Sequence, residues 1–217
     1  EFVEGIDEAW SISAPPALCA MFGRLGVFGD IDLVVSGINP GANVGRAVYH
    51  SGTVGACLTA RNGGISGVAV SQSVDAFGVE GQGWEEALGS QVWQGAGDVA
   101  AIAVGALIQD MPDEPIVLNI NVPNRLAEDM VGWKRTDVGH APPRGLATAK
   151  LEPKPGAHDT YHVEMEWGDA IQIPESDDGG AVMAGYASLT WLGRLEGLTP
   201  HHPTMLATER AMDEFYR

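Results

Sequence analysis

The chain has 217 residues, of which 45% are hydrophobic and 19% charged, as is typical of a soluble globular protein of one domain, with or without an extension. Its formal net charge of -17 disfavours nucleic acid and anionic membrane surfaces as partners, because both attract basic patches. There is no apolar run of about 18 residues and the acidic N-terminus (EFVEGIDEAW) does not resemble a secretory signal, so we expect a cytoplasmic protein.

The first half of the chain alternates between strand and helix patterns. Short β-branched runs predict buried strands, and longer segments with apolar residues at helical spacing predict helices. The predicted strands are 31–36, 66–71 and 115–122, and the predicted helices are 53–62 and 91–110. Strand, helix and strand in this order predict parallel pairing, so the fold class is predicted to be α/β.

After Pro123 the pattern changes. Residues 131–173 contain short alternating runs such as 160–167, separated by the Pro/Gly/Lys-rich segment 142–156. This pattern predicts antiparallel hairpins and a flexible extension rather than further βαβ units.

The end of the chain predicts one more strand and a final helix. Residues 186–192 (YASLTWL) form the strand pattern, and residues 203–216 form an amphipathic helix opened by Pro203. We therefore divide the chain into an α/β core, 1–130, and a second part, 131–217, with the hairpin extension, the last core strand and the C-terminal helix. The cysteines, Cys19 and Cys57, are expected to be buried free thiols.

Residues 36–53 (SGINPGANVGRAVYHSGT) carry the strongest chemical signal. They follow the carboxyl end of a predicted parallel strand, where open α/β sheets place their ligands. Glycines allow the backbone to approach an anion, and the helix entry at Ser51–Thr53 offers unpaired N–H groups and hydroxyls. The amides of Asn39 and Asn43 can donate to phosphate oxygens or offer an oxygen to Mg2+ or Mn2+. The alternative is a long turn rich in Gly and Asn, although connections of this length in compact domains are usually functional or disordered.

These residues resemble the SurE (stationary-phase survival protein E) family. The run VVSGINPGANVGRAVYHSGTVGA is similar to the family's SGIN-x-G-x-N-x-G signature followed by YSGTV. Three further segments match in order, namely SISAPPALCAMF, LNINVP and DDGGAVMAGYASLT, so the similarity spans roughly residues 11–200. The resemblance implies a Rossmann-like core with a C-terminal β-hairpin extension that swaps between protomers, giving homodimers or homotetramers.

The resemblance also implies a metal-dependent 5'/3'-nucleotidase that hydrolyses nucleoside monophosphates. In the family, Mg2+ or Mn2+ is held by two aspartates of an N-terminal NDDG motif, a serine and the asparagine of SGIN. The match places that metal-binding asparagine at Asn39, which with Asn43 forms the catalytic set. Phosphate binding is implied for Asn43, Ser51, Gly52 and Thr53.

No NDDG motif occurs in this sequence. The only Asp-Asp pair, Asp177-Asp178, lies in the match to a C-terminal segment and cannot be reassigned on residue type. No strand signal precedes residue 31 either, so we expect the family's opening strand and aspartates to precede Glu1, unless the chain is a degenerate relative. Without the aspartates the chain is expected to bind metal weakly.

Three functions remain open from the sequence. The first is the phosphomonoesterase that the resemblance implies. The second is a truncated or degenerate protein that binds phosphate or nucleotide without turnover. The third is an oligomeric interaction protein in which the loop is structural.

Overall fold

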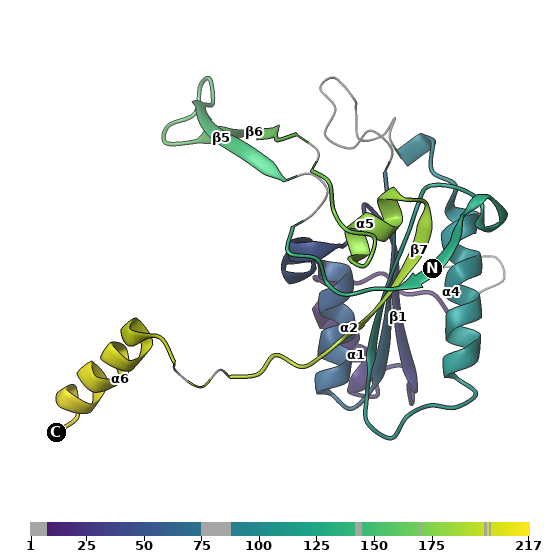
Figure 1. Ribbon diagram of the computed structural model, residues 1–217, viewed down its shortest axis with the longest axis horizontal. Helices are drawn as coiled ribbons and strands as arrows, with labels where there is room; N and C mark the ends of the chain where they lie inside the picture. Colours follow the sequence, from purple (N-terminus) through teal and green to yellow (C-terminus); the bar gives the residue numbers. More distant parts are fainter. Residues whose placement is uncertain (1–7, 75–87, 142–144, 170, 198, 200) are drawn as a thin grey trace.

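The computed structural model describes residues 8–74, 88–141, 145–169, 171–197, 199 and 201–217. A five-stranded sheet with helices on both faces forms its centre (Figure 1). The strands, in sheet order, are β1 (Leu33–Pro40), β2 (Ser66–Gln72), β3 (Val117–Val122), β7 (Tyr186–Leu192) and β4 (Gly132–Arg135). β1, β2 and β3 are parallel, β7 is antiparallel to β3, and β4 is parallel to β7. The predicted α/β class is confirmed.

Helices α1 and α2 lie on one side of the sheet and α4 lies on the other (Figure 1). The α-helices are α1 (Pro16–Arg24), α2 (Gly52–Asn62), α4 (Trp93–Leu107), α5 (Asp178–Met183) and α6 (Pro203–Phe215), and the 3-10 helices are η1 (Gly45–His50) and η2 (Ala127–Asp129). The helices predicted at 53–62, 91–110 and 203–216 are confirmed as α2, α4 and α6. Helix α1 was not predicted. Among these helices and the rest of the described chain, none is long and apolar enough to cross a membrane.

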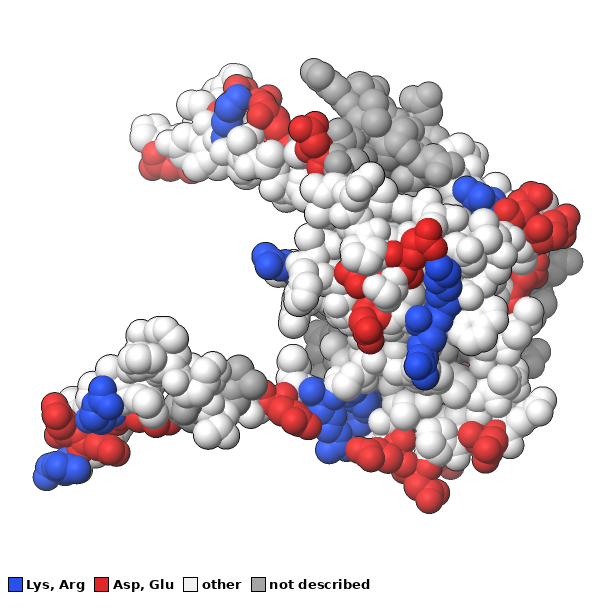
Figure 2. All heavy atoms as spheres, in the orientation of Figure 1, with Lys and Arg blue, Asp and Glu red and all other residues white. Residues whose placement is uncertain are grey.

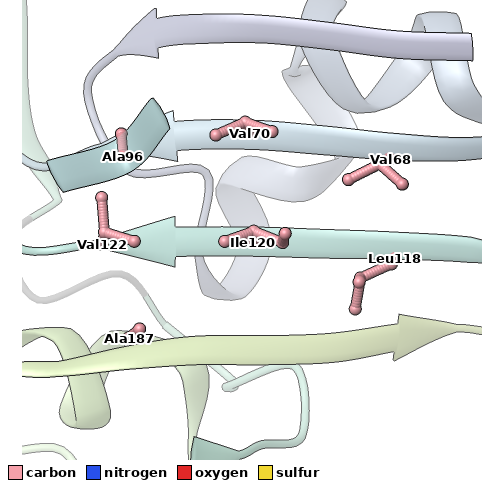
Figure 3. Packing of buried hydrophobic residues seen from close by; sticks show 7 residues of the cluster. All are labelled: Val68, Val70, Ala96, Leu118, Ile120, Val122 and Ala187. Atoms are coloured by element: carbon pink, nitrogen blue, oxygen red, sulfur yellow. The ribbon is translucent and has the colours of Figure 1, made fainter. Parts of the chain in front are cut away.

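The main core lies between the sheet and α4. Alternate side chains of the central strands point to this face and meet Ala96 of α4 and Ala187 of β7 (Figure 3). They are Val68 and Val70 from β2 and Leu118, Ile120 and Val122 from β3, each at most 2% exposed. Full burial of side chains of this size stabilises the fold by about 1.5–3 kcal/mol each. Because burial requires apolar residues at these positions, these strands could be predicted from the sequence.

On the opposite face α2 packs directly onto β2. Val54 and Cys57 of α2 form a second buried cluster with Ala69 and Val117. A Cβ atom at Gly67 would lie 2.6 Å from Cys57 Cβ, so only glycine allows this close approach. Burial therefore raises the pKa of the Cys57 thiol to about 12.

Both cysteines are free thiols, as expected from the sequence. Cys57 is fully buried, as predicted, whereas Cys19 is only partly buried because it lies on α1, the outer of the two helices on its side of the sheet.

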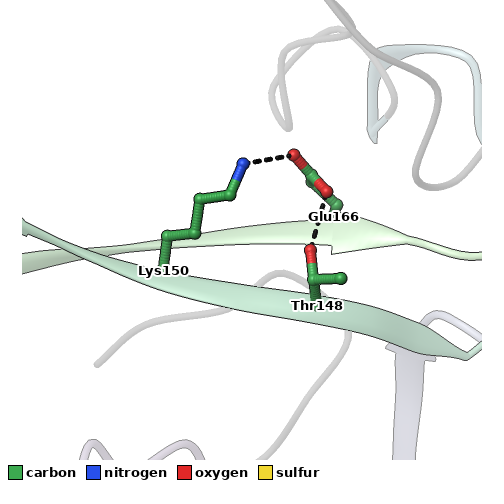
Figure 4. A network of polar contacts seen from close by, with 3 residues as sticks. All are labelled: Thr148, Lys150 and Glu166. Carbon is green, nitrogen blue, oxygen red and sulfur yellow. Dashed lines mark hydrogen bonds and ion pairs between the residues drawn. The ribbon is translucent and has the colours of Figure 1, made fainter.

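The predicted hairpin is present as β5 (Leu146–Pro153) and β6 (Tyr161–Trp167), which pair antiparallel and project from the body of the molecule (Figure 1). Exposed polar contacts join its strands: Glu166 accepts from Thr148 Oγ1 at 2.7 Å and forms an ion pair with Lys150 at 3.2 Å (Figure 4). The region 131–173 also supplies β4, a mostly exposed edge strand of the central sheet that the sequence analysis did not predict. α6 also stands away from the body and has no buried residue.

β1 approaches β2 at a point that only glycine permits. Gly37 has φ +135°, and a Cβ atom there would overlap the carbonyl oxygen of Val70. The β1–β2 register shifts between Ser36 and Asn39, immediately around this residue. Gly37 therefore determines how the last residues of β1 leave the regular ladder.

We expect Gly37→Ala to lower the free energy of unfolding by about 2–5 kcal/mol, because it adds both backbone strain and steric overlap. Gly105→Ala in α4 is the matched control, since the added Cβ would have no heavy atom within 4 Å beyond the neighbouring backbone of its own helix; there we expect no loss and a gain of up to about 1 kcal/mol. Urea denaturation of both variants measures the difference. Equal stabilities would contradict the role of Gly37.

The raised pKa of Cys57 predicts low thiol reactivity in the folded protein. An ordinary thiol is largely ionised at pH 10, whereas Cys57 stays protonated at any pH well below about 12. In a Cys19→Ser variant, Ellman's reagent should react at pH 10 only as fast as the protein unfolds, and rapidly in guanidinium. The Cys57→Ser variant, which leaves Cys19, is the control. Fast reaction of Cys57 in the native protein would contradict this burial.

Candidate functional site

β1 extends to Pro40, four residues beyond the predicted end of the strand. Asn39 therefore lies in the strand, opposite Ser71 of β2, rather than in the loop where the sequence analysis placed it. Its Nδ2 donates to the carbonyl oxygen of Gly41 at 2.7 Å. Because this contact uses the amide nitrogen, the half-buried Asn39 keeps its Oδ1 available as an acceptor or a ligand.

The carboxyl half of the sheet has a buried polar face beneath the loop that follows β1. Small hydroxyl and amide side chains from three adjacent strands are each at most 2% exposed, namely Ser71, Asn119, Asn121, Ser188 and Thr190. Asn121 pairs with Ser71 on one side and Ser188 on the other, so the residues form a row across the sheet. Since buried polar groups require hydrogen-bond partners, the segments that pack on this face must supply donors and acceptors.

Asn43 supplies partners for this face on β2 and β3, whereas Thr136 Oγ1 pairs with Ser188 and Thr190 on β7. The backbone N–H of Asn43 donates to Asn121 Oδ1 at 2.7 Å, and its carbonyl oxygen accepts from Asn121 Nδ2 at 3.2 Å and Asn119 Nδ2 at 2.9 Å. Its own Nδ2 donates to Ser71 Oγ at 2.7 Å. The Asn43 side chain is 9% exposed, and its amide nitrogen is committed to β2. Asn39 and Asn43 thus come together at Ser71.

Asp178, at the start of α5, holds the residue two positions further along the loop. The backbone N–H of Gly45 lies 3.0 Å from both carboxylate oxygens, and the N–H groups of Gly139 and Gly179 donate to Oδ1 at 3.1 and 2.8 Å. Asp178 is fully buried. Burial raises the pKa of this carboxyl, and the N–H donors of Gly139, Gly45 and Gly179 offset part of the rise.

The sequence analysis did not identify Asp178 or the β3 asparagines as part of the site. Asp178 was noted only as half of an Asp-Asp pair, and its partner Gly45 is 133 residues away in the sequence. Asn119 and Asn121 were included only as letters of the LNINVP match. Their alternation with apolar residues is a usable signal, because it predicts a polar face on an otherwise buried strand.

The loop ends at the N-terminus of α2. Ser51 is the N-cap, because its Oγ accepts from the N–H of Val54 at 3.1 Å. Gly52 is exposed and Thr53 is 9% exposed. The N–H groups of Gly52 and Thr53 have no hydrogen-bond acceptor among the described residues, as is usual in the first turn of a helix. This end of α2 therefore presents the partial positive charge of the helix dipole.

The described residues do not by themselves fit a divalent cation. Within the described ranges, no group of three or more His, Cys, Asp or Glu side chains could hold a metal ion. Asn39 Oδ1 is one neutral ligand, whereas Mg2+ and Mn2+ sites in proteins usually include carboxylates. Asp178 does not fill this role, because its oxygens already accept from three backbone N–H groups.

The sheet and this loop define an open α/β protein with a long loop at the carboxyl edge of its parallel strands, the edge at which such folds usually bind their ligands. The chain belongs to the SurE family: the family model described as "Survival protein SurE" matches residues 3–144. The resemblance to the SurE family that the sequence analysis identified is therefore confirmed.

Known relatives share part of their length with this chain. It is 35% identical to "5'-nucleotidase SurE" of Clostridium beijerinckii over 142 residues, which are 65% of this chain and 52% of that protein. It is 29% identical to the Haemophilus influenzae protein of the same name over 186 residues, 83% of this chain and 66% of the relative. The SurE protein from Aquifex aeolicus has a similar crystal structure, with a TM-score of 0.63, 26% identity and coverage of 93% of this chain and 74% of that one. The chain thus spans about half the length of the first of these relatives.

The pairing of Asn43 with β3 predicts a large effect of Asn121→Leu. Leucine has a similar size but removes one acceptor and one donor, leaving the buried N–H of Asn43 unpaired. We expect a loss of about 2–4 kcal/mol in the free energy of unfolding. Asn62→Leu, at the exposed end of α2, is the control and should change the stability by less than about 0.5 kcal/mol. Similar effects of both substitutions in urea denaturation would show that Asn121 does not hold the loop.

Proposed function

We propose that this chain acts as a phosphomonoesterase of the 5'/3'-nucleotidase type, with nucleoside monophosphates as substrates. Membership of the SurE family and the names of the relatives support this activity. The observation that carries the proposal is the loop from Asn43 to Thr53, which is fixed at its start by buried hydrogen bonds and ends at a free helix N-terminus.

The described residues supply phosphate binding and orientation. The N–H groups of Gly52 and Thr53, with the Thr53 hydroxyl, are the donors for the phosphate oxygens, as helix N-termini bind anions in many folds. The Ser51 side chain caps the helix and orients this turn. Asn39 keeps its predicted role as a metal ligand, with Oδ1 as the available donor atom. Asn43 was predicted to bind phosphate and to act in catalysis; we propose that it contributes by anchoring the loop, because its amide nitrogen donates to Ser71.

Backbone donors suit a protein with a net charge of -17. The loop from Asn43 to Thr53 has one Arg or Lys side chain, Arg46, which is exposed. On the face drawn in Figure 2, Lys and Arg side chains gather over β4 with Asp and Glu side chains beside them, and Lys134 there forms an ion pair with Glu175. Fixed N–H dipoles bind an anion without requiring a basic surface.

A divalent cation, Mg2+ or Mn2+, remains part of the proposal. When bound beside Asn39, it would neutralise charge on the phosphoryl oxygens. Its carboxylate ligands are not among the described residues, so we attribute to these residues only binding and orientation.

The second candidate function is binding of phosphate or nucleotide without turnover. The lack of a metal-binding cluster within the described part of the chain favours it. The two candidates differ in one measurable property, because both predict affinity for a nucleoside monophosphate and only the first predicts release of phosphate.

We also propose that the protein is a homodimer or homotetramer. The projecting hairpin exposes large apolar side chains, among them Leu151, Val163 and Met165. The C-terminal end of α6 exposes Phe215, and its C-cap residue Tyr216 is exposed as well. Apolar side chains gathered on two projecting segments are typical of subunit contacts.

The first test is hydrolysis of AMP with Mn2+ or Mg2+. We expect Asn39→Ala and Thr53→Val each to lower kcat/KM by at least about tenfold, since each removes a contact to the cation or the phosphate. Asn62→Ala, at the far end of α2, should have the wild-type rate. Activity that is unaffected by both site substitutions would exclude this loop as the active site. AMP binding without phosphate release would support the second candidate.

A further inference from the structure

Asp178 is a buried carboxylate with no cationic partner among the described residues. Its contacts are three backbone N–H groups, and they come from three segments: Gly45 in the loop, Gly139 after β4, and Gly179 in its own helix. The carboxylate therefore joins the loop to the second half of the chain.

Stability alone is a weak reason for a charge in this position. Removing a carboxylate from water is unfavourable, and even buried ion pairs can often be replaced by apolar residues of similar size without loss of stability. What the carboxylate provides is geometry, because its two oxygens can accept from several N–H groups at fixed angles.

The contact from Asp178 to Gly45 fixes the loop at the residue where η1 begins. Asn43 is held by β3, Val44 is 1% exposed, and Gly45 has φ +54° and turns the chain into η1. η1 begins at Gly45 and ends at His50, directly before the cap Ser51. A rotation at Gly45 would therefore be transmitted through one short helix to the N-terminus of α2.

We propose that Asp178 is a positioning residue, which holds the Gly45 N–H and so fixes the 43–53 loop in the conformation that binds a phosphate group. This inference rests on the proposed function, since it assigns the phosphate of the substrate to that loop. Asp178 itself is buried beneath the loop and does not contact the substrate.

The test compares Asp178→Asn with Asp177→Asn. Within the described ranges, the adjacent Asp177 has no side-chain hydrogen bond or ion pair to the loop; its Oδ1 accepts from Ser176 Oγ at 3.3 Å. Calorimetric titration with AMP and with inorganic phosphate, performed well below the Tm of each variant, measures affinity. Hydrogen exchange measures protection of the amides in residues 43–53.

We expect Asp178→Asn to bind both probes at least about tenfold more weakly, because its amide nitrogen opposes the Gly45 N–H. Exchange should be faster at Gly45 and in η1, while β2 and β3 stay protected. Asp177→Asn should bind within about twofold of the wild type. If Asp178→Asn does not fold, Asp178→Ser, which is smaller and uncharged, takes its place with the same expected results.

Several outcomes would overturn the proposal. One is a folded Asp178→Asn protein of lower Tm with wild-type affinity, which is the result of a merely structural role. Another is an equal loss in Asp177→Asn, which would indicate a general effect of charge. If the wild type binds neither probe, the proposed function fails; exchange then decides, and unchanged protection of residues 43–53 in Asp178→Asn would reject the positioning role as well.

Discussion

The rest of the site depends on the pairing between the peptide group of Asn43 and the side-chain amides of β3. A buried asparagine in the middle of a sheet is costly unless both its donor and its acceptor find partners. Asn121 satisfies this need by bonding to both the N–H and the carbonyl of one residue in the loop. The loop in turn supplies the hydrogen-bond partners of Ser71 and Asn121, so the two features require each other.

The α2 side of the sheet is consequently divided into two parts. Where the body of α2 packs, small apolar residues and Gly67 allow close contact. Toward the carboxyl ends of the parallel strands, hydroxyls and amides replace them. The apolar part fixes the axis of the helix, and the polar part fixes the loop that leads into it. Two separate sets of contacts therefore hold the N-terminus of α2 in place. This arrangement suits recognition of an anion by a protein with a large negative charge, because backbone dipoles work only when they are well fixed.

Much of the fold could be predicted from the sequence because its determinants are local. The strands at 31–36, 66–71 and 115–122 are short β-branched runs, and Ser51 precedes a helix that Gly63 ends. β4 could not be predicted in this way, since it has four residues and is stabilised as a strand by its neighbour β7. The contact between the Asp178 carboxylate and Gly45 could not be predicted either, because the two residues are distant in the sequence and meet only in the folded chain. The SGIN loop was found as a pattern, but its strand-bound first half, with Asn39 opposite Ser71, follows from tertiary pairing.

The order of strands in the sheet also bears on how the protein is made. β7 lies between β3 and β4, so β4 has no neighbour in the sheet until the much later residues Tyr186–Leu192 have been synthesised. The Gly45 contact likewise joins residues 133 apart. During translation the nascent chain would therefore carry an unfinished sheet, with the far edge of β3 open, while the hairpin segment leaves the ribosome. Residues 43–53 are synthesised before Asp178, so a chain released between the two would contain this loop without the contact that holds Gly45.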